Sequence, residues 1–488
     1  MNIQKNFDIA FKEHQKGNLF DAEILYKKIL KTDPDNLKTN FFLGTLYIQK
    51  NDFSSAKDSF VKVILIKPNH IYAQNYLGIA FKELKIFKKA KKCFEQTIKI
   101  NKNFVEGYYN LGLLFKDIED YKSAKKYYLK TILINPSHQK AYNNLGNICS
   151  NLGQHKEAIQ YFKKAIKINP ANAQAYNNLG NKFKELGKYK QSIIAYNKAI
   201  QINPNINQIY ENLGNVFRIK KNFEKAIEYF DKSNAQSAKA QSLECTYFKY
   251  GLKKYREKIK HYLNEDTLNR RIATISSYVS ATNSLKNIYP FCKNPIKYFY
   301  KTNIENDLPN KNKFQKDLLD YLENLNPVWE PSSKTTTKGY QTTGNLFAED
   351  NIEFKKLIQL IEGALISYKK KFSNSDDLII KKWPNKTMLN AWYVKLVQQG
   401  YQKSHIHPDG WISGVFYLKV PNFTTKYGGS IELTLYGYDY PINKNLPSLV
   451  HSPKNFDLIL FPSSLFHKTI PFKSKENRHV IAFDLIPI

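Results

Sequence analysis

The sequence has few of the residues that build disulfide-rich or zinc-binding domains. Its four cysteines are far apart in a chain of 488 residues, and no two have CxxC spacing. This usage supports neither a disulfide framework nor a zinc site. We therefore predict that Cys93, Cys149, Cys245 and Cys292 are reduced core residues of a cytoplasmic protein.

Long apolar runs are also missing. No run reaches the roughly 18 residues that span a bilayer, and the first residues, Met1–Asn6, lack the apolar core of a signal peptide. We expect no membrane partner. Hydrophobic residues at 42% and aromatic residues at 14% argue against a disordered chain. A chain of this length is too long for one core and predicts two or three domains.

Arginine is scarce, since only five of the 75 basic residues are arginine. The net charge of +33 suggests a nucleic-acid partner, but the lysines are spread over the whole chain, so we expect none. The scarcity draws attention to Arg478, the only arginine after Arg271. A guanidinium is a planar fork that binds a carboxylate through two hydrogen bonds, which lysine cannot do.

A repeat with a period of 34 residues occupies the first half of the chain. Leu-Gly pairs recur in register, each followed twelve positions after the glycine by a small residue and sixteen after it by an aromatic residue. This pattern is typical of tetratricopeptide repeats, and it predicts an all-α solenoid of about seven helical hairpins over residues 1–240. The pairs are Leu43-Gly44, Leu77-Gly78, Leu111-Gly112, Leu145-Gly146, Leu179-Gly180 and Leu213-Gly214.

Asparagines precede four of these pairs, at Asn110, Asn144, Asn178 and Asn212. They resemble the asparagine ladder in the repeat region of O-linked N-acetylglucosamine transferases. That resemblance implies hydrogen bonds to the backbone of a protein or peptide substrate extended along the groove. The alternative is that each asparagine bonds within its own repeat, and both interpretations stay open.

We predict that residues 241–310 form a helical connector. Residues 241–261 and 266–278 have helical character, prolines 290 and 295 exclude a continuous helix afterwards, and the polar stretch 302–312 is a candidate linker.

Helical spacing returns at 314–325 and 352–372. Short apolar strands then follow without helices between them, at 389–396, 412–420, 430–435, 456–461 and 479–486. This pattern predicts a jelly-roll domain at 311–488.

Five of the ten histidines lie between residues 405 and 479. His405, His407 and Asp409 stand at alternate positions, His467 follows an apolar strand, and Arg478 comes eleven positions later. Two histidines and one carboxylate form the facial triad of a non-heme Fe(II) oxygenase. The arginine adds a binding group for an acidic co-substrate.

Together these stretches resemble the 2-oxoglutarate/Fe(II)-dependent oxygenases related to prolyl hydroxylases, which are often fused to tetratricopeptide repeats. The likeness covers roughly 335–488 and is carried by 405–418, 428–432, 460–467 and 478–483. It implies a double-stranded β-helix that uses Fe(II), O2 and 2-oxoglutarate to hydroxylate a substrate, with release of succinate and CO2.

The resemblance assigns His467 as the distal ligand and Arg478 as the anchor of 2-oxoglutarate. Two triads share His407: one takes the carboxylate of Asp409, and the other takes His405. We favour His407, Asp409 and His467, because that set supplies the carboxylate. Tyr417 either lines the co-substrate pocket or is a core residue.

Two other functions compete with the enzyme. The repeats could serve as an interaction scaffold beside a degenerate, non-catalytic oxygenase domain. The asparagine pattern also suggests a transferase, but no GxGxxG motif or nucleotide-binding region follows the repeats. The complete set of candidate iron and co-substrate residues favours the dioxygenase.

Overall fold

The computed structural model describes residues 3–233, 235–308, 310–325, 327–331, 334–342, 344–422, 425–437 and 440–488. The chain divides into two compact units, Met1–Pro204 and Asn205–Ile488. The last repeat hairpin therefore falls in the second unit. The three domains expected at 1–240, 241–310 and 311–488 stay a prediction.

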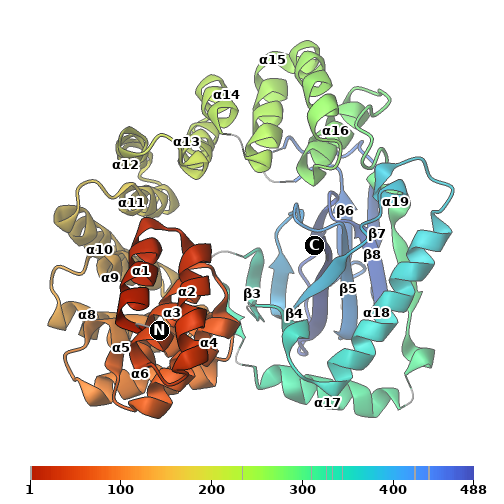
Figure 1. Ribbon diagram of the computed structural model, residues 1–488. Helices are drawn as coiled ribbons and strands as arrows, with labels where there is room; N and C mark the ends of the chain where they lie inside the picture. The colour runs from red at the N-terminus through yellow and green to blue at the C-terminus, as the bar shows by residue number, and fades with distance from the viewer. Residues whose placement is uncertain are drawn as a thin grey trace. The chain divides into compact units, whose positions relative to one another are not determined.

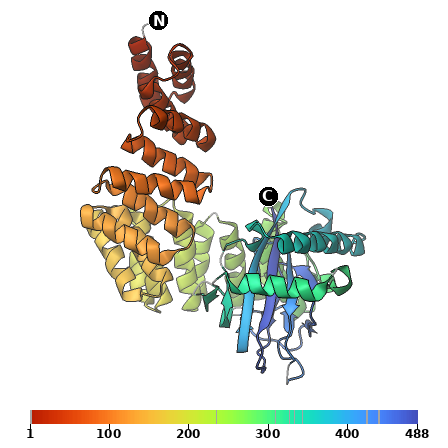
Figure 2. The same ribbon diagram turned by 90° about the horizontal axis from the view of Figure 1, so that it is seen from below.

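The predicted all-α solenoid is confirmed. Consecutive helices pair as antiparallel hairpins, and in the first unit these hairpins stack one on the next (Figure 2). The first unit holds α1 (Ile3–Lys16), α2 (Leu19–Thr32), α3 (Leu37–Gln49), α4 (Phe53–Ile66), α5 (Ile71–Glu83), α6 (Phe87–Ile100), α7 (Val105–Asp117), α8 (Tyr121–Ile134), α9 (Gln139–Asn151), α10 (His155–Ile168), α11 (Ala173–Glu185) and α12 (Tyr189–Ile202). The hairpin of α13 (Asn207–Ile219) and α14 (Phe223–Lys232) begins the second unit.

From the second hairpin on, each hairpin is closed by a glycine of its first helix against an aromatic ring of its second. A Cβ added at Gly146 would lie 2.4 Å from Cε1 of Phe162, and Phe162 is only 1% exposed. The close approach explains the period of the sequence, because glycine alone leaves room for the ring. The same relation joins Gly44 to Phe60, Gly78 to Phe94, Gly112 to Tyr128, Gly180 to Tyr196 and Gly214 to Phe230.

We predict that Gly146→Ala destabilises the repeat unit by about 1–3 kcal/mol, the usual cost of overfilling a packed core. Chemical denaturation followed by the helical circular dichroism signal measures this loss. Gly363→Ala is the control, because Gly363 is exposed within a helix and its added Cβ meets nothing within 4 Å. That change should be neutral or stabilising by about 0.4–1 kcal/mol. Wild-type stability of Gly146→Ala would contradict the packing described here.

Two connector helices follow the repeats. The first, α15 (Gln236–Glu265), is broken at Gly251, whose φ of 76° and ψ of −166° are not helical; the second is α16 (Arg270–Thr282). Both predicted connector helices are confirmed with shifted bounds. The break was not predicted, although glycine is the residue that adopts this conformation at low cost.

All strand pairings in the described part of the second unit are antiparallel, in two sheets. The larger has the order β1-β8-β5-β10-β4-β3-β2, and the smaller β7-β6-β9. This arrangement agrees with the predicted jelly roll. The strands are β1 (Tyr300–Asn303), β2 (Val328–Trp329), β3 (Thr336–Gln341), β4 (Thr387–Gln402), β5 (Ile412–Lys419), β6 (Ile431–Thr434), β7 (Ser448–His451), β8 (Asp457–Pro462), β9 (Phe466–Thr469) and β10 (Arg478–Pro487).

Helices cover one face of the larger sheet. Figure 1 shows α17 (Lys311–Glu323) and α18 (Ile352–Lys371) beside it, where α17 packs on β5 and α18 on β8. The short helix α19 (Leu378–Lys381) and the 3-10 turns Pro295–Tyr298, Glu305–Asp307 and Leu346–Ala348 complete the domain. Strands β5, β8 and β10 are almost wholly buried, so polar side chains on them are notable.

The structure differs from the predicted linker at 302–312. Its first two residues belong to β1, which pairs with β8 at the edge of the larger sheet. The connector is therefore continuous with the sheet domain. No helix among the described residues has the length and apolar character needed to cross a membrane.

Candidate functional site

Three of the predicted histidines come together. His405 and His407 lie between β4 and β5, and His467 is on β9. The main chains of His405 and His467 exchange two hydrogen bonds, of 3.1 and 3.0 Å, and His407 N–H donates to the carbonyl of Ser463 at 3.0 Å. One potential ligand atom from each imidazole lies within 4.8 Å of the other two.

The hydrogen bonds of these imidazoles leave the same nitrogen of each ring available. Nδ1 of His405 lies 2.6 Å from the carbonyl of Lys403, and Nδ1 of His467 lies 3.2 Å from that of Leu465. A carbonyl only accepts, so Nδ1 carries the proton and Nε2 keeps its lone pair. This is the usual arrangement of histidines that bind a metal through Nε2.

His407 has the same arrangement with a carboxylate. Its Nδ1 lies 2.7 Å from Oδ2 of Asp484, and its Nε2 is buried without a hydrogen-bond partner among the described residues. The hydroxyl of Ser413 donates to Oδ1 of Asp484 at 2.7 Å. Asp484 thus fixes the ring of His407, a role that sequence analysis missed. The alternation along β10 places Asp484 on the same face as Arg478 and could have found it.

Two imidazoles of the cluster, those of His405 and His467, have lowered pKa values. Burial lowers the pKa of His405 to about 3, with a further decrease from His407 that outweighs the hydrogen bond to Lys403. Burial also holds the pKa of His467 well below its ordinary value, and His405 and His407 add to the effect. Neutral imidazoles are the form that binds a metal.

Arg478, the first residue of β10, is 2% exposed. Its guanidinium lies over the ring of Tyr417, 5.0 Å from the ring centre. Among the described residues, Nε and Nη1 of Arg478 have no hydrogen-bond partner. Burial raises the pKa of Tyr417 to about 12, so its hydroxyl is neutral. A buried cation without an anion is costly, so Arg478 is a candidate residue for binding an anion.

The histidines and the arginine line one small cavity. A metal at the three imidazoles and an anion at Arg478 would therefore share one space between the two sheets. The lining residues are Trp392, Gln402, His405, His407, Ser413, Gly414, Val415, Ile431, Phe461, His467, Thr469, Arg478 and Ala482.

Asp409, the carboxylate of the favoured triad, is not brought into this group. The amide of Gly410 donates to the carbonyl of His407 at 3.1 Å, so residues 407–410 form a turn instead of continuing an extended strand. Asp409 lies on this turn and is exposed. Of the two triads, the described residues gather the one made of three histidines.

The asparagines of the repeats bond between neighbouring hairpins. Asn110 donates to Asn75 at 2.8 Å, and Asn178 donates to Asn143 at 3.1 Å. Asn144 bonds the hydroxyls of Tyr109 and Tyr128, at 3.2 and 3.3 Å. These contacts give three of the four predicted peptide-binding residues a role in joining repeats. Asn212, on α13 in the second unit, is buried.

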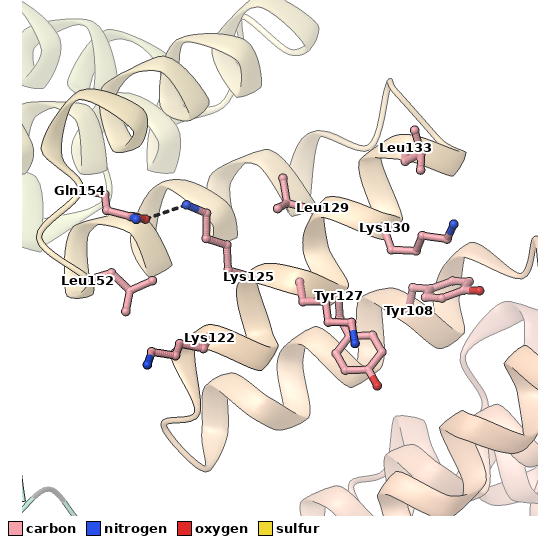
Figure 3. Close-up of a pocket in the computed structure, with 10 residues that line it drawn as sticks. Tyr108, Lys122, Lys125, Tyr127, Leu129, Lys130, Leu133, Leu152 and Gln154 are labelled. Atoms are coloured by element: carbon pink, nitrogen blue, oxygen red, sulfur yellow. Dashed lines mark hydrogen bonds between the residues drawn. The ribbon is translucent and has the colours of Figure 1, made fainter.

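A hollow on α8 is the other prominent feature of the first unit (Figure 3). Lysines and apolar side chains surround it, and Leu133 is 69% exposed. Lys125 bonds Gln154 at 2.7 Å, as the dashed line in Figure 3 marks. The lining residues are Tyr108, Lys122, Lys125, Lys126, Tyr127, Leu129, Lys130, Leu133, Leu152 and Gln154.

Solved structures similar to this chain match only parts of it. "Crystal structure of MamA" is 31% identical, covers 34% of this chain and 97% of its own, and has a TM-score of 0.32. A tetratricopeptide repeat protein from Parabacteroides merdae is 18% identical, covers 53% and 97%, and has a TM-score of 0.41. "YrrB: a TPR protein with an unusual peptide-binding site" is 20% identical, covers 40% and 97%, and has a TM-score of 0.32. No curated protein matches the chain.

Family models match both halves of the chain. Tetratricopeptide repeats match residues 37–70, 105–138, 140–172, 173–206 and 208–235. The family described as "Putative 2OG-Fe(II) oxygenase" matches residues 390–484, a range that contains all three clustered histidines and Arg478. The chain is therefore a fusion of tetratricopeptide repeats with a C-terminal domain of this 2OG-Fe(II) oxygenase family.

Proposed function

We propose that the C-terminal domain is a 2-oxoglutarate- and Fe(II)-dependent dioxygenase that hydroxylates a protein or peptide recruited by the repeats. The observation that carries this proposal is the shared cavity, where three imidazoles with free Nε2 atoms face the same space as a buried guanidinium. The Nε2 of His407 and the Nε and Nη1 of Arg478 are buried without a hydrogen-bond partner among the described residues, which fits a bound metal and a bound anion.

In this proposal His405, His407 and His467 hold the iron. The hydrogen bonds from their Nδ1 atoms keep each ring in the tautomer that binds through Nε2. Arg478 binds the distal carboxylate of 2-oxoglutarate, and the ring of Tyr417 packs against the face of the guanidinium. When bound, Fe(II) would supply the reaction of O2 with 2-oxoglutarate that places one oxygen on the substrate and the other in succinate, with loss of CO2.

Apolar side chains form part of the cavity wall and keep water away from the proposed site. Val415, Ile431 and Phe461 are apolar and line the space around the imidazoles. They exclude bulk water, which strengthens the attraction between Arg478 and a carboxylate. Four free, buried cysteines agree with a reducing compartment, so a cytoplasmic location remains part of the proposal.

Release of succinate from 2-oxoglutarate tests the proposed activity. The purified chain would be supplied with Fe(II), O2 and 2-oxoglutarate and screened against peptides derived from a proteome. We expect succinate and hydroxylated peptide from the wild type and neither from His467→Ala. Equal succinate from both proteins across the screen would favour the scaffold instead.

Recruitment by the repeats predicts a second result. The double variant Asn144→Ala and Asn178→Ala should raise the KM for a peptide found in that screen several-fold without changing kcat. The lost contacts would bind the peptide equally in the ground state and in the transition state, so only its affinity changes. Loss of their hydrogen bonds should cost about 1 kcal/mol of stability each. Asn197→Ala, exposed on α12, is the control. An unchanged KM would leave these asparagines with their bonds between repeats and direct attention to the hollow on α8.

A further inference from the structure

Arg270 connects α16 to the segment that carries two of the clustered histidines. Its Nε donates to the carbonyl of Pro408 at 3.0 Å, and its Nη2 donates to that of Asp409 at 3.1 Å. These two carbonyls follow His407 directly. Nη1 donates to Leu268 at 3.0 Å, so each nitrogen of the guanidinium is engaged.

Thr274, one turn further along α16, reaches the segment that carries the third histidine. Its hydroxyl lies 2.6 Å from the carbonyl of Ser464 and 2.9 Å from that of Arg270, and its single proton favours the shorter contact. Thr274 is 3% exposed. Ser464 is three residues before His467. One face of one helix thus holds both segments that bring the imidazoles together.

The helix is itself anchored. Arg271 binds Glu244 of α15 through two hydrogen bonds, of 2.9 and 3.1 Å. Glu244 is 1% exposed and also accepts a hydrogen bond from Tyr440 at 2.9 Å. A buried, paired contact of this kind fixes the position of α16 more firmly than an exposed ion pair does.

The choice of residue supports a positioning role. The chain has only five arginines, and two of them are Arg270 and Arg271. A guanidinium presents its donors in one rigid plane, so it can span two successive carbonyls at once. The single ammonium of lysine lacks that geometry. The two carbonyls that Arg270 spans therefore require arginine at this position.

We infer that α16 is part of the support of the metal centre and that Arg270 is a positioning residue for His407. Arg270 holds the turn at 407–410, and Thr274 holds the segment before His467. This inference rests on the proposed iron site and gives the helical connector a function in it. Partners outside the ligand shell commonly alter metal affinity by 10–100-fold.

The test is an anaerobic titration with Co(II) as the probe, followed by its visible absorption. Arg270→Lys keeps the charge and loses the fork. It should weaken Co(II) binding about tenfold and change the absorption band, because the main chain that follows His407 is no longer held in place and the position of the imidazole changes with it. Arg256→Lys, the same change at an exposed position of α15, should titrate as the wild type.

The outcomes separate this inference from the proposed function. If His407→Ala abolishes Co(II) binding while Arg270→Lys titrates as the wild type, the positioning role is overturned. If His407→Ala itself binds as the wild type, the proposed metal site fails. Should Arg270→Lys not fold, Thr274→Val decides, since it removes one hydrogen bond at nearly constant volume. A folded Thr274→Val with reduced Co(II) affinity supports the inference, and wild-type affinity overturns it.

Discussion

His467→Ala is expected to abolish both Fe(II) binding and succinate release. The variant removes one of three imidazoles from a site that has no fourth protein ligand among the described residues. Loss of one position leaves the metal with two ligands and without a defined orientation toward the co-substrate. Equilibrium dialysis with Fe(II) under anaerobic conditions, followed by a turnover assay, measures both effects.

Asp409→Ala is the matched control for this result. Asp409 was the favoured carboxylate ligand from the sequence, yet it lies exposed on the turn after His407. We expect Asp409→Ala to bind Fe(II) like the wild type, and His405→Ala to lose it as His467→Ala does. Loss of Fe(II) by Asp409→Ala with retention by His405→Ala would restore the triad favoured from the sequence.

Arg478→Lys is expected to raise the KM for 2-oxoglutarate by about tenfold or more. A hydrogen bond to a charged group contributes about 1.5–3 kcal/mol, and each 1.4 kcal/mol is a factor of ten. Lysine retains the charge but cannot make two parallel hydrogen bonds to a carboxylate. Fe(II) affinity should hardly change, because the arginine is not a metal ligand. Initial-rate kinetics over a range of 2-oxoglutarate concentrations measure the effect.

Arg256→Lys serves as the control for this substitution too, since Arg256 is exposed on α15. A wild-type KM in Arg478→Lys would show that another residue anchors the co-substrate or that 2-oxoglutarate is not used. In the second case the guanidinium of Arg478 would bind a different anion.

The repeats were predictable because their signal is local and recurs. A contact such as that of Gly146 with Phe162 joins two positions that are always sixteen residues apart. The same pair of residues therefore recurs in the sequence every 34 residues. Short, largely apolar stretches without helices between them located β4, β5, β6, β8 and β10. Strands β7 and β9, with the sequences SLVH and FHKT, contain at most two apolar residues each, so no apolar run marks them.

The third ligand could not be decided from spacing. Positions 405, 407 and 409 share one side of an extended strand, and the sequence contains no direct sign of where extension ends. In the structure the turn at 407–410 diverts Asp409, and Arg270 holds that turn from more than 130 residues away in sequence. Such long-range contacts leave no local pattern. The role of the connector was unreadable for the same reason.

The most direct test of the account is an anaerobic titration of the Fe(II)-loaded chain with 2-oxoglutarate, followed in the visible range. Chelation of Fe(II) by the keto acid gives a charge-transfer band that neither component has alone, and no protein substrate is needed. We expect a saturable band in the wild type, a much higher 2-oxoglutarate requirement in Arg478→Lys, and no band in His467→Ala. Absence of the band in a folded, Fe(II)-loaded wild type would contradict this expectation.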